Sequence, residues 1–174
     1  MKLLITGNSG SGKSTLLPAL EARGFKTYNT DDIAAVCRLE DRVSGEVVDW
    51  PNGFVDWTKY AWRWQAAPLR RLLDSATDVA VAAIMENQYE FYDWFDWRFV
   101  IIISDEALAR HWQHSSDHHA GAHPGNLERA LSRNKLKEQQ FLDDGCIPIA
   151  GDRPIEEMSA DITRIIHEHI PVAK

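Results

Sequence analysis

The sequence predicts an α/β protein of three layers, in which a parallel sheet lies between two layers of helices. Five short segments, most of them apolar, alternate with longer segments whose apolar residues recur every three or four positions, as in strands connected by helices. Residues 98–103 form an almost continuous run of Phe, Val and Ile after one Arg, which is typical of a parallel strand covered on both faces. The 174 residues suit one domain, so we expect a single unit over residues 1–174.

The elements are expected in a regular order along the chain. We expect strands at residues 2–6, 25–28, 78–85, 98–103 and 146–149, and helices at residues 13–23, 33–38, 54–76, 105–114, 126–142 and 154–169. The first helix carries three leucines on one face and ends at Gly24, while Pro154 suits the first turn of the last helix. These alternating strands and helices form the βαβ units of a parallel sheet.

Two segments between the second and third strands interrupt this regular order. Residues 54–76 show a long helical pattern that Pro68 breaks. Residues 39–50 contain Ser44-Gly45 between two runs of mixed polar and apolar residues, so we expect a small hairpin there.

Composition and charge exclude several classes of protein. A formal net charge of −7 argues against affinity for nucleic acid polymers or anionic membranes, and no apolar run approaches the roughly 20 residues that a membrane helix needs. Residues 1–5 lead straight into a glycine-rich segment, so we expect no signal peptide. Cys37 and Cys146 have neither disulfide nor metal-ligand spacing, which favours a cytoplasmic protein.

A phosphate-binding motif follows the first strand. Residues 7–14 match the pattern G-x-x-x-x-G-K-[ST] in full and lie between an expected strand and an expected helix. The candidate nucleotide-binding residues are therefore Gly7, Asn8, Ser9, Gly10, Ser11, Gly12, Lys13, Ser14 and Thr15. Glycines allow successive N–H groups to point at phosphate oxygens, and the helix adds its positive N-terminal end. The motif predicts that Lys13 contacts the β- and γ-phosphates of ATP and that Ser14 ligates Mg²⁺.

The rest of the chain lacks the motifs of two large classes of nucleotide-binding protein. The Asn134-Lys135 pair continues into a helix rather than into the Asn-Lys-x-Asp motif of a GTPase. The third strand ends in Glu86-Asn87-Gln88, without the acidic pair of motor-type ATPases. A small nucleoside, nucleotide or metabolite kinase remains.

The sequence resembles the adenylate kinase and shikimate kinase group of small P-loop kinases, above all their uncharacterised bacterial ATP-binding members. The resemblance spans nearly the whole chain. It rests on residues 7–15, on residues 28–32 after the second strand, on residues 86–88 after the third, and on residues 151–154 after the fifth. It implies the strand order 2-3-1-4-5, with donor and acceptor sites above the carboxyl edge of the sheet.

The resemblance also implies an acceptor site near the second strand. Asp31 matches the second acid of an Asp-x-Asp pair, which would remove a proton from the acceptor, whereas Asn29 replaces the first, often Mg²⁺-linked acid. Asp32 is a second candidate contact for the acceptor. Alternatively, both aspartates cap a helix that starts at Ile33.

By the same resemblance, residues 39–76 occupy the place of an acceptor-binding insertion. Tryptophans gather there, and Trp57 and Arg63 are candidate contacts for a flat ring or a phosphate. The aromatic residues at positions 57, 60 and 64 also fit a packed helix face. Glu86, Asn87 and Gln88 are expected to face the same cleft.

The group places a lid after the fourth strand, and its arginines usually neutralise the transferring phosphoryl group. Residues 115–125 occupy that place but contain no arginine. Arg110, Arg129 and Arg133 flank the segment, and the last two lie one helical turn apart, so they are candidates to supply the charge. Arg153 resembles a residue that contacts adenine, although its loop also fits a helix cap at Asp152.

These observations predict an ATP- and Mg²⁺-dependent phosphotransferase that acts on a small acceptor, a nucleoside or a nucleotide, as a monomer or homodimer. Two alternatives remain open. The first is a non-catalytic or regulatory ATP-binding module, which Asn29 and the arginine-free lid segment favour. The second is a kinase of another small metabolite or of an antibiotic.

Overall fold

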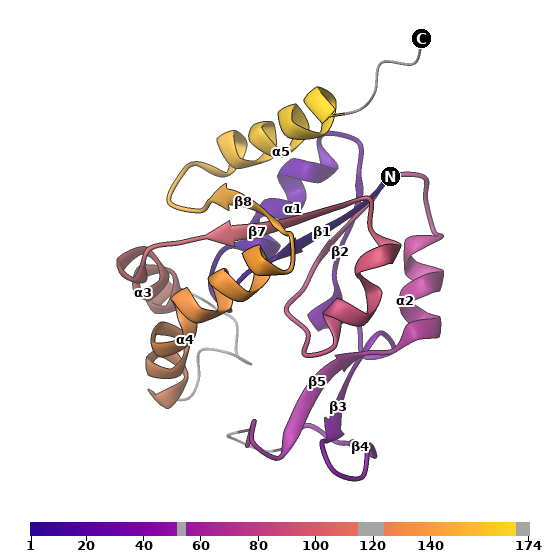
Figure 1. The fold of residues 1–174 in the computed structure, drawn as a ribbon, viewed down its shortest axis with the longest axis vertical. Coiled ribbons are helices and arrows are strands. Elements are labelled where there is room, and N and C mark those ends of the chain that lie inside the picture. The colour runs from indigo at the N-terminus through magenta and orange to yellow at the C-terminus, as the bar shows by residue number, and fades with distance from the viewer. Residues whose placement is uncertain (52–54, 115–123, 170–174) are drawn as a thin grey trace.

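A five-stranded parallel sheet forms the centre of the molecule (Figure 1). The computed structural model describes residues 1–51, 55–114 and 124–169. The strands of the sheet are β1 (Lys2–Thr6), β2 (Lys26–Asn29), β6 (Val79–Ala82), β7 (Trp97–Ile102) and β8 (Ile147–Ala150). Their order, β2-β6-β1-β7-β8, is the predicted order 2-3-1-4-5 counted among these five strands, so the predicted fold class is confirmed.

Helices cover both faces of this sheet, as Figure 1 shows. One layer consists of α1 (Lys13–Glu21) and α5 (Ile155–His169); the other consists of α2 (Ala66–Leu73), the 3₁₀ helix η2 (Gln88–Trp94) and α4 (Pro124–Asp143), and α3 (Asp105–His114) packs against α4. Because side chains alternate along a strand, Leu3 and Ile5 pack with α1 and α5 while Leu4 packs with the other layer. Among the described helices, none has the length and apolarity that crossing a bilayer requires.

A second, antiparallel sheet projects from the body below α2 in Figure 1. It consists of β3 (Cys37–Asp41), β4 (Val47–Val48) and β5 (Tyr60–Trp64), in the order β4-β3-β5. The hairpin expected within residues 39–50 is therefore confirmed as β3 and β4.

Of the two helices expected in this region, the one at residues 33–38 is wrong, and the one at residues 54–76 is confirmed only at residues 66–73, which form α2. Residues 33–38 run into β3 after the short 3₁₀ helix η1 (Thr30–Asp32), and β5 occupies part of the expected helix at residues 54–76. The aromatic spacing of β5 matched a helical period, but Tyr and Trp also favour strands, and pairing with β3 decides the outcome. Pro68 lies in the first turn of α2, where a missing N–H costs little.

Trp64 anchors the second sheet to the body. Its side chain is 2% exposed and stacks on Phe95 at a centroid distance of 5.9 Å. Its indole Nε1 donates a hydrogen bond to Thr30 Oγ1 at 3.0 Å, and its backbone exchanges two hydrogen bonds with the side-chain amide of Asn87. The end of β5 is thus fixed both to η1 and to the segment that follows β6.

We expect Trp64→Ala to lower the free energy of unfolding by about 3–5 kcal/mol, because it leaves a large cavity and breaks the bond to Thr30. Trp64→Phe keeps a ring and should cost less. Chemical denaturation measures both, with Tyr89→Ala as the control, because Tyr89 is 60% exposed. Equal losses for Trp64→Ala and Tyr89→Ala would contradict the anchoring role.

Candidate functional site

The loop between β1 and α1 adopts the backbone that its glycines predict. Gly10 has a φ of +83°, in the left-handed region, and a Cβ atom there would lie 2.5 Å from the indole Nε1 of Trp112. A Cβ atom at Gly7 would lie 2.8 Å from Ser11 Oγ. From α3, Trp112 Nε1 donates to Ser9 O at 3.1 Å. The loop is therefore closely packed, and side chains larger than hydrogen have no room at these two glycines.

The groups inside the loop fit a phosphate. Lys13 is buried, and its ammonium donates to Gly7 O at 3.0 Å and to Asn8 O at 2.9 Å. Ser11 Oγ is buried without a hydrogen-bond partner among the described residues, so a polar group remains for a ligand to satisfy. The N-terminus of α1 follows directly, with the exposed Ser14 and Thr15 in its first turn.

Asn8 joins this loop to α4. Its side-chain amide donates to Ala130 O at 2.8 Å and to Asn134 Oδ1 at 3.2 Å. The amide of Asn134 donates in turn to Ile103 O and to Asp105 Oδ1, at 3.0 and 2.9 Å. Both asparagines are buried. The position of α4 is thus set by the phosphate loop and by the end of β7.

A cavity of about 550 Å³ opens between the loop, η1, the second sheet and α4. It is lined by Asn8, Ser9, Asp31, Asp32, Arg42, Trp50, Trp57, Trp62, Ile84, Met85, Glu86, Trp112, Arg129, Ala130, Arg133 and Lys137. Six of the predicted catalytic and acceptor residues come together here, namely Asp31, Asp32, Trp57, Glu86, Arg129 and Arg133. The phosphate loop contributes to the same cavity through Asn8 and Ser9.

Three tryptophans of the insertion form one wall of this cavity. Trp50 meets Trp57 and Trp62 edge-to-face, at centroid distances of 6.1 and 5.3 Å. The guanidinium of Arg129 lies over the ring of Trp57 at 5.2 Å, so the wall joins α4. Such a wall offers aromatic surface to a planar ligand.

The two aspartates lie in η1 at the carboxyl edge of β2. Trp62 Nε1 donates to Asp31 Oδ1 at 3.0 Å, and Asn29 Nδ2 donates to Asp32 Oδ2 at 2.8 Å. The alternative that they cap a helix at Ile33 is wrong, because residues 34–36 form a turn that leads into β3. Asn29, at the position expected for an acid, contacts Asp32 rather than the cavity.

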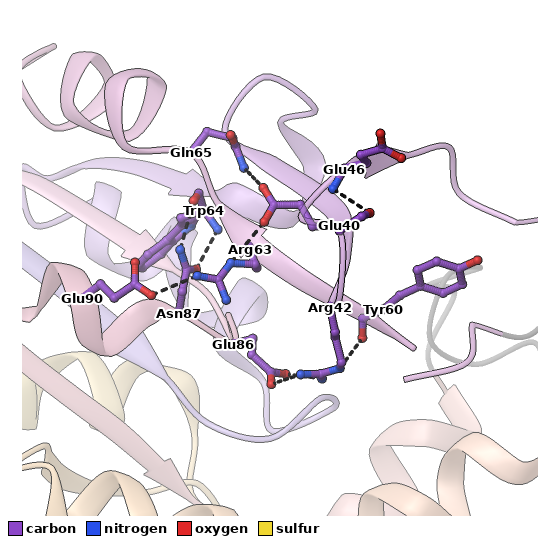
Figure 2. A network of polar contacts seen from close by, with 11 residues as sticks. Glu40, Arg42, Glu46, Tyr60, Arg63, Trp64, Gln65, Glu86, Asn87 and Glu90 are labelled. Atoms are coloured by element: carbon purple, nitrogen blue, oxygen red, sulfur yellow. Dashed lines mark hydrogen bonds and ion pairs between the residues drawn. The ribbon is translucent and has the colours of Figure 1, made fainter. Parts of the chain in front are cut away.

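An ion pair between Arg42 and Glu86, shown in Figure 2, lines the cavity on the side of the second sheet. The two terminal guanidinium nitrogens of Arg42 donate to the two carboxylate oxygens of Glu86, at 2.5 and 2.9 Å. Arg42 Nε also donates to Trp57 O and Tyr60 O, at 3.2 and 3.1 Å. Arg42 therefore positions the segment that carries Trp57. Sequence reasoning missed it, because no motif marks a charged residue in a hairpin turn.

The cationic wall comes from α4. Arg129, Arg133 and Lys137 follow one another at intervals of four residues and all line the cavity. Burial and the neighbouring charge of Arg133 lower the pKa of Arg129, and the same two causes lower the pKa of Lys137. Sequence reasoning missed Lys137, although it continues the spacing that singled out the two arginines.

Three other predicted arginines lie away from the cavity. Arg63 pairs with Glu40 and Glu90 (Figure 2), at 3.2 and 2.9 Å. Arg153 pairs with Glu157 and Asp161 on α5. Arg110 is exposed on α3 and does not line the cavity. Most of the expected lid segment, residues 115–123, lies outside the described residues.

Two predicted polar residues and one expected cap hold the fold together. Asn87 bonds the backbone of Trp64, and Gln88 Oε1 accepts from Thr6 Oγ1 and from Met85 N, at 3.2 and 3.1 Å. Both are buried. Asp152, expected to cap the last helix, instead accepts from Ser104 N. The polar residues after a buried strand correctly indicated that these side chains make specific contacts. The pattern did not show whether those contacts are with a ligand in a cleft or with other buried groups of the protein.

A family model described as an AAA domain matches residues 3–131. The chain belongs to this family. The match to the AAA domain family includes the phosphate loop, the insertion and Arg129, and it ends before Arg133 and Lys137.

Solved structures show the same fold at low sequence identity. The chain is similar to a deoxyadenosine kinase from M. mycoides with bound dATP, at 11% identity and a TM-score of 0.57, over 96% of this chain and 100% of that chain. It is also similar to a shikimate kinase from Aquifex aeolicus, at 16% identity and a TM-score of 0.52, over 97% of both chains. Among the curated proteins, there is no significant match. The chain thus has the P-loop fold on which small-molecule kinases are built.

We expect the Arg42–Glu86 pair to stabilise the protein at neutral pH and to lose this effect in acid. The hydrogen bond from Arg42 lowers the pKa of Glu86, so this stabilisation is present above the unfolded-state pKa of about 4.3 and is lost as the pH falls further. Because the pair is part-exposed, Glu86→Gln should cost about 1 kcal/mol or less at pH 7 and less than that at pH 3.

Denaturant unfolding at the two pH values measures this difference, with Glu21→Gln as the control. Glu21 is exposed and forms no ion pair with a described residue. An equal loss at both pH values would show that the Glu86 charge does not contribute.

Proposed function

We propose that this protein is an ATP-dependent phosphotransferase that acts on a small acceptor, a nucleoside or a nucleotide. One observation carries the proposal: the phosphate loop lines a cavity that also has an aromatic wall and a carboxylate. Asn8 and Ser9 of the loop line the same cavity as Asp31 and the tryptophans. Phosphoryl transfer requires such adjacency, because the acceptor must lie in line with the transferred group.

The donor side consists of the loop and the start of α1. The loop glycines and Lys13 would hold the phosphates of ATP, with the Ser11 hydroxyl as a further polar contact. Ser14 would ligate Mg²⁺ through its hydroxyl. When bound, Mg·ATP supplies the transferable phosphoryl group.

The acceptor side consists of Asp31 and the tryptophan wall. The Asp31 carboxylate would accept the proton of the acceptor hydroxyl, and its bond from Trp62 Nε1 fixes one of its oxygens. Trp57 and Trp62 would flank a flat ring. Asp32 would act as a secondary polar contact at the edge of the cavity.

Arg129 and Arg133 would supply the cationic charge that phosphoryl transfer needs. Negative charge spreads over the oxygens of the transferring group, and fixed cations stabilise it most when they need no rearrangement. Both arginines already line the cavity, on a helix that Asn8 ties to the loop. In this proposal the two arginines of α4 take the role that lid arginines have in the kinases the sequence resembles, since residues 115–125 contain no arginine.

A regulatory ATP-binding module is the second candidate function. The observation that favours it is Asn29, which has no negative charge and bonds Asp32 at the position expected for an acid. A kinase of a different metabolite or of an antibiotic shares the donor site and differs in the acceptor. ADP release measured with a panel of nucleosides, nucleotides, sugars and antibiotics distinguishes all three.

We expect Lys13→Ala to abolish the thermal stabilisation that Mg·ATP gives to the parent protein. A ligand stabilises the folded state by mass action, and Lys13 is the main side-chain contact proposed for its phosphates. Thermal unfolding with and without Mg·ATP measures this effect. If the variant were stabilised as much as the parent, the donor site would be wrongly placed.

We expect Asp31→Asn to lower turnover by a factor of about 10²–10⁴ while ATP affinity stays nearly unchanged, because the amide does not accept a proton. Steady-state kinetics with the best acceptor of the panel measure turnover, and calorimetry measures ATP binding. Asp93→Asn is the matched control, because Asp93 is an exposed aspartate outside the cavity. Unchanged turnover would leave Asp31 without a role as the base.

A further inference from the structure

The α4 wall of the cavity carries more positive charge than the donor phosphates require. Arg129, Arg133 and Lys137 all line the cavity, and the span from the first to the last is about 12 Å along the helix. Among the described carboxylates, none forms an ion pair with any of these three side chains. An array of this length extends well past a single phosphoryl group.

Glu86 lines the same cavity as the three cations of α4, but its carboxylate is already paired with Arg42. Both of its oxygens bind Arg42, so one cation of the opposite wall is neutralised. Lys137 is part-buried and its ammonium lies 6.0 Å from the ring centroid of Phe141. Burial and the charge of Arg133 lower the pKa of Lys137, and the charge of Glu86, which acts in the opposite direction, offsets them only in part.

The place of Lys137 separates it from the donor loop. Asn8 contacts α4 at Ala130 O, and Lys137 lies about 10 Å further along the helix from that point. It therefore shares the cavity with Glu86 and Met85 beyond the loop. An anion that meets Lys137 there belongs to the acceptor rather than to the nucleotide in the loop.

The opposite wall restricts what else this acceptor contains. Trp50, Trp57 and Trp62 present aromatic surface, which suits a planar ring. The two walls belong to one cavity of about 550 Å³, a size in the range of small-ligand sites. A ligand that uses both walls combines a flat ring with a negative charge.

We propose that the acceptor is a planar ring compound that bears its own anionic group, a phosphomonoester or a carboxylate, and that Lys137 with Arg133 holds this group. The inference rests on the proposed function, since it treats the cavity as the acceptor site. It goes beyond that function by excluding neutral nucleosides as the preferred ligands.

Equilibrium calorimetry tests the proposal on the full chain, with a non-hydrolysable ATP analogue filling the phosphate loop. One arm compares four nucleosides with their 5′-monophosphates, and the other compares uracil with its carboxylate, orotate. We expect one anionic series to bind at least about 10-fold more tightly than its neutral counterparts, because charge-assisted bonds exceed neutral ones in strength. The arm that shows the preference identifies the anion.

Variants of Lys137 separate its charge from its packing. Lys137→Met keeps the length of the chain next to Phe141 and should remove most of the preference for the anion, while Lys137→Arg should retain it. Lys26→Met is the matched control, because Lys26 is an exposed lysine outside the cavity. Loss of affinity for neutral and charged rings alike in Lys137→Met would show a structural role and overturn the proposal.

Two further outcomes also overturn it: neutral rings that bind the parent as tightly as charged ones, and a parent that binds none of the ring compounds. ADP release keeps this proposal and the proposed function apart. Turnover of neutral acceptors without a charge preference would reject the anion site and leave the phosphotransferase standing. If the protein binds anionic rings selectively through Lys137 but releases no ADP from ATP in their presence, the anion site is supported and the phosphotransferase is rejected.

Discussion

The hydrogen bonds of the Asn8 side chain are the constraint on which the rest of the site depends. Asn8 belongs to the phosphate loop, yet its amide donates to Ala130 O and Asn134 Oδ1 on α4. Buried amides of this kind are costly to leave unpaired, so loop and helix hold a fixed relative position. Because Ala130 lies between the two arginines of the cavity wall in sequence, the same bonds place their charges beside the loop.

The other wall depends on contacts between the second sheet and the body. Trp64 fixes one end of β5 by packing and by its bonds to Asn87. At the other end of β5, Arg42 binds the backbone of the preceding turn at Trp57 O and also binds Glu86, as Figure 2 shows for the Glu86 contact. The first contact is buried and the second is part-exposed, so their strengths differ. The tryptophan wall therefore has one strong anchor and one weaker clamp near the cavity, and the clamp is the part that pH affects.

The sequence predicted the central sheet well because most of its strands are apolar runs whose burial depends on the fold as a whole, as at Val79–Ala82. It predicted the loop because the chemistry of phosphate binding requires those residues in that order. It failed at residues 54–76, where the aromatic spacing fits helix and strand alike and only pairing with β3 decides. Arg42 escaped notice for a related reason, since its partner Glu86 lies 44 residues away in sequence. Lys137 escaped notice because only the fold brings its helix to the cavity.

The absence of arginine from the expected lid segment suggested a non-catalytic protein, but α4 brings two arginines to the cavity. A charge supplied by a lid reaches the phosphates only after closure, and the closing motion then contributes to the barrier. Here Arg129 and Arg133 line the cavity from a helix whose buried asparagine bonds the loop itself. Preorganised cations need no rearrangement when charge develops, which is the condition under which electrostatic stabilisation is largest. In the proposed phosphotransferase, the tie between loop and helix would therefore compensate for the absence of arginine from residues 115–125.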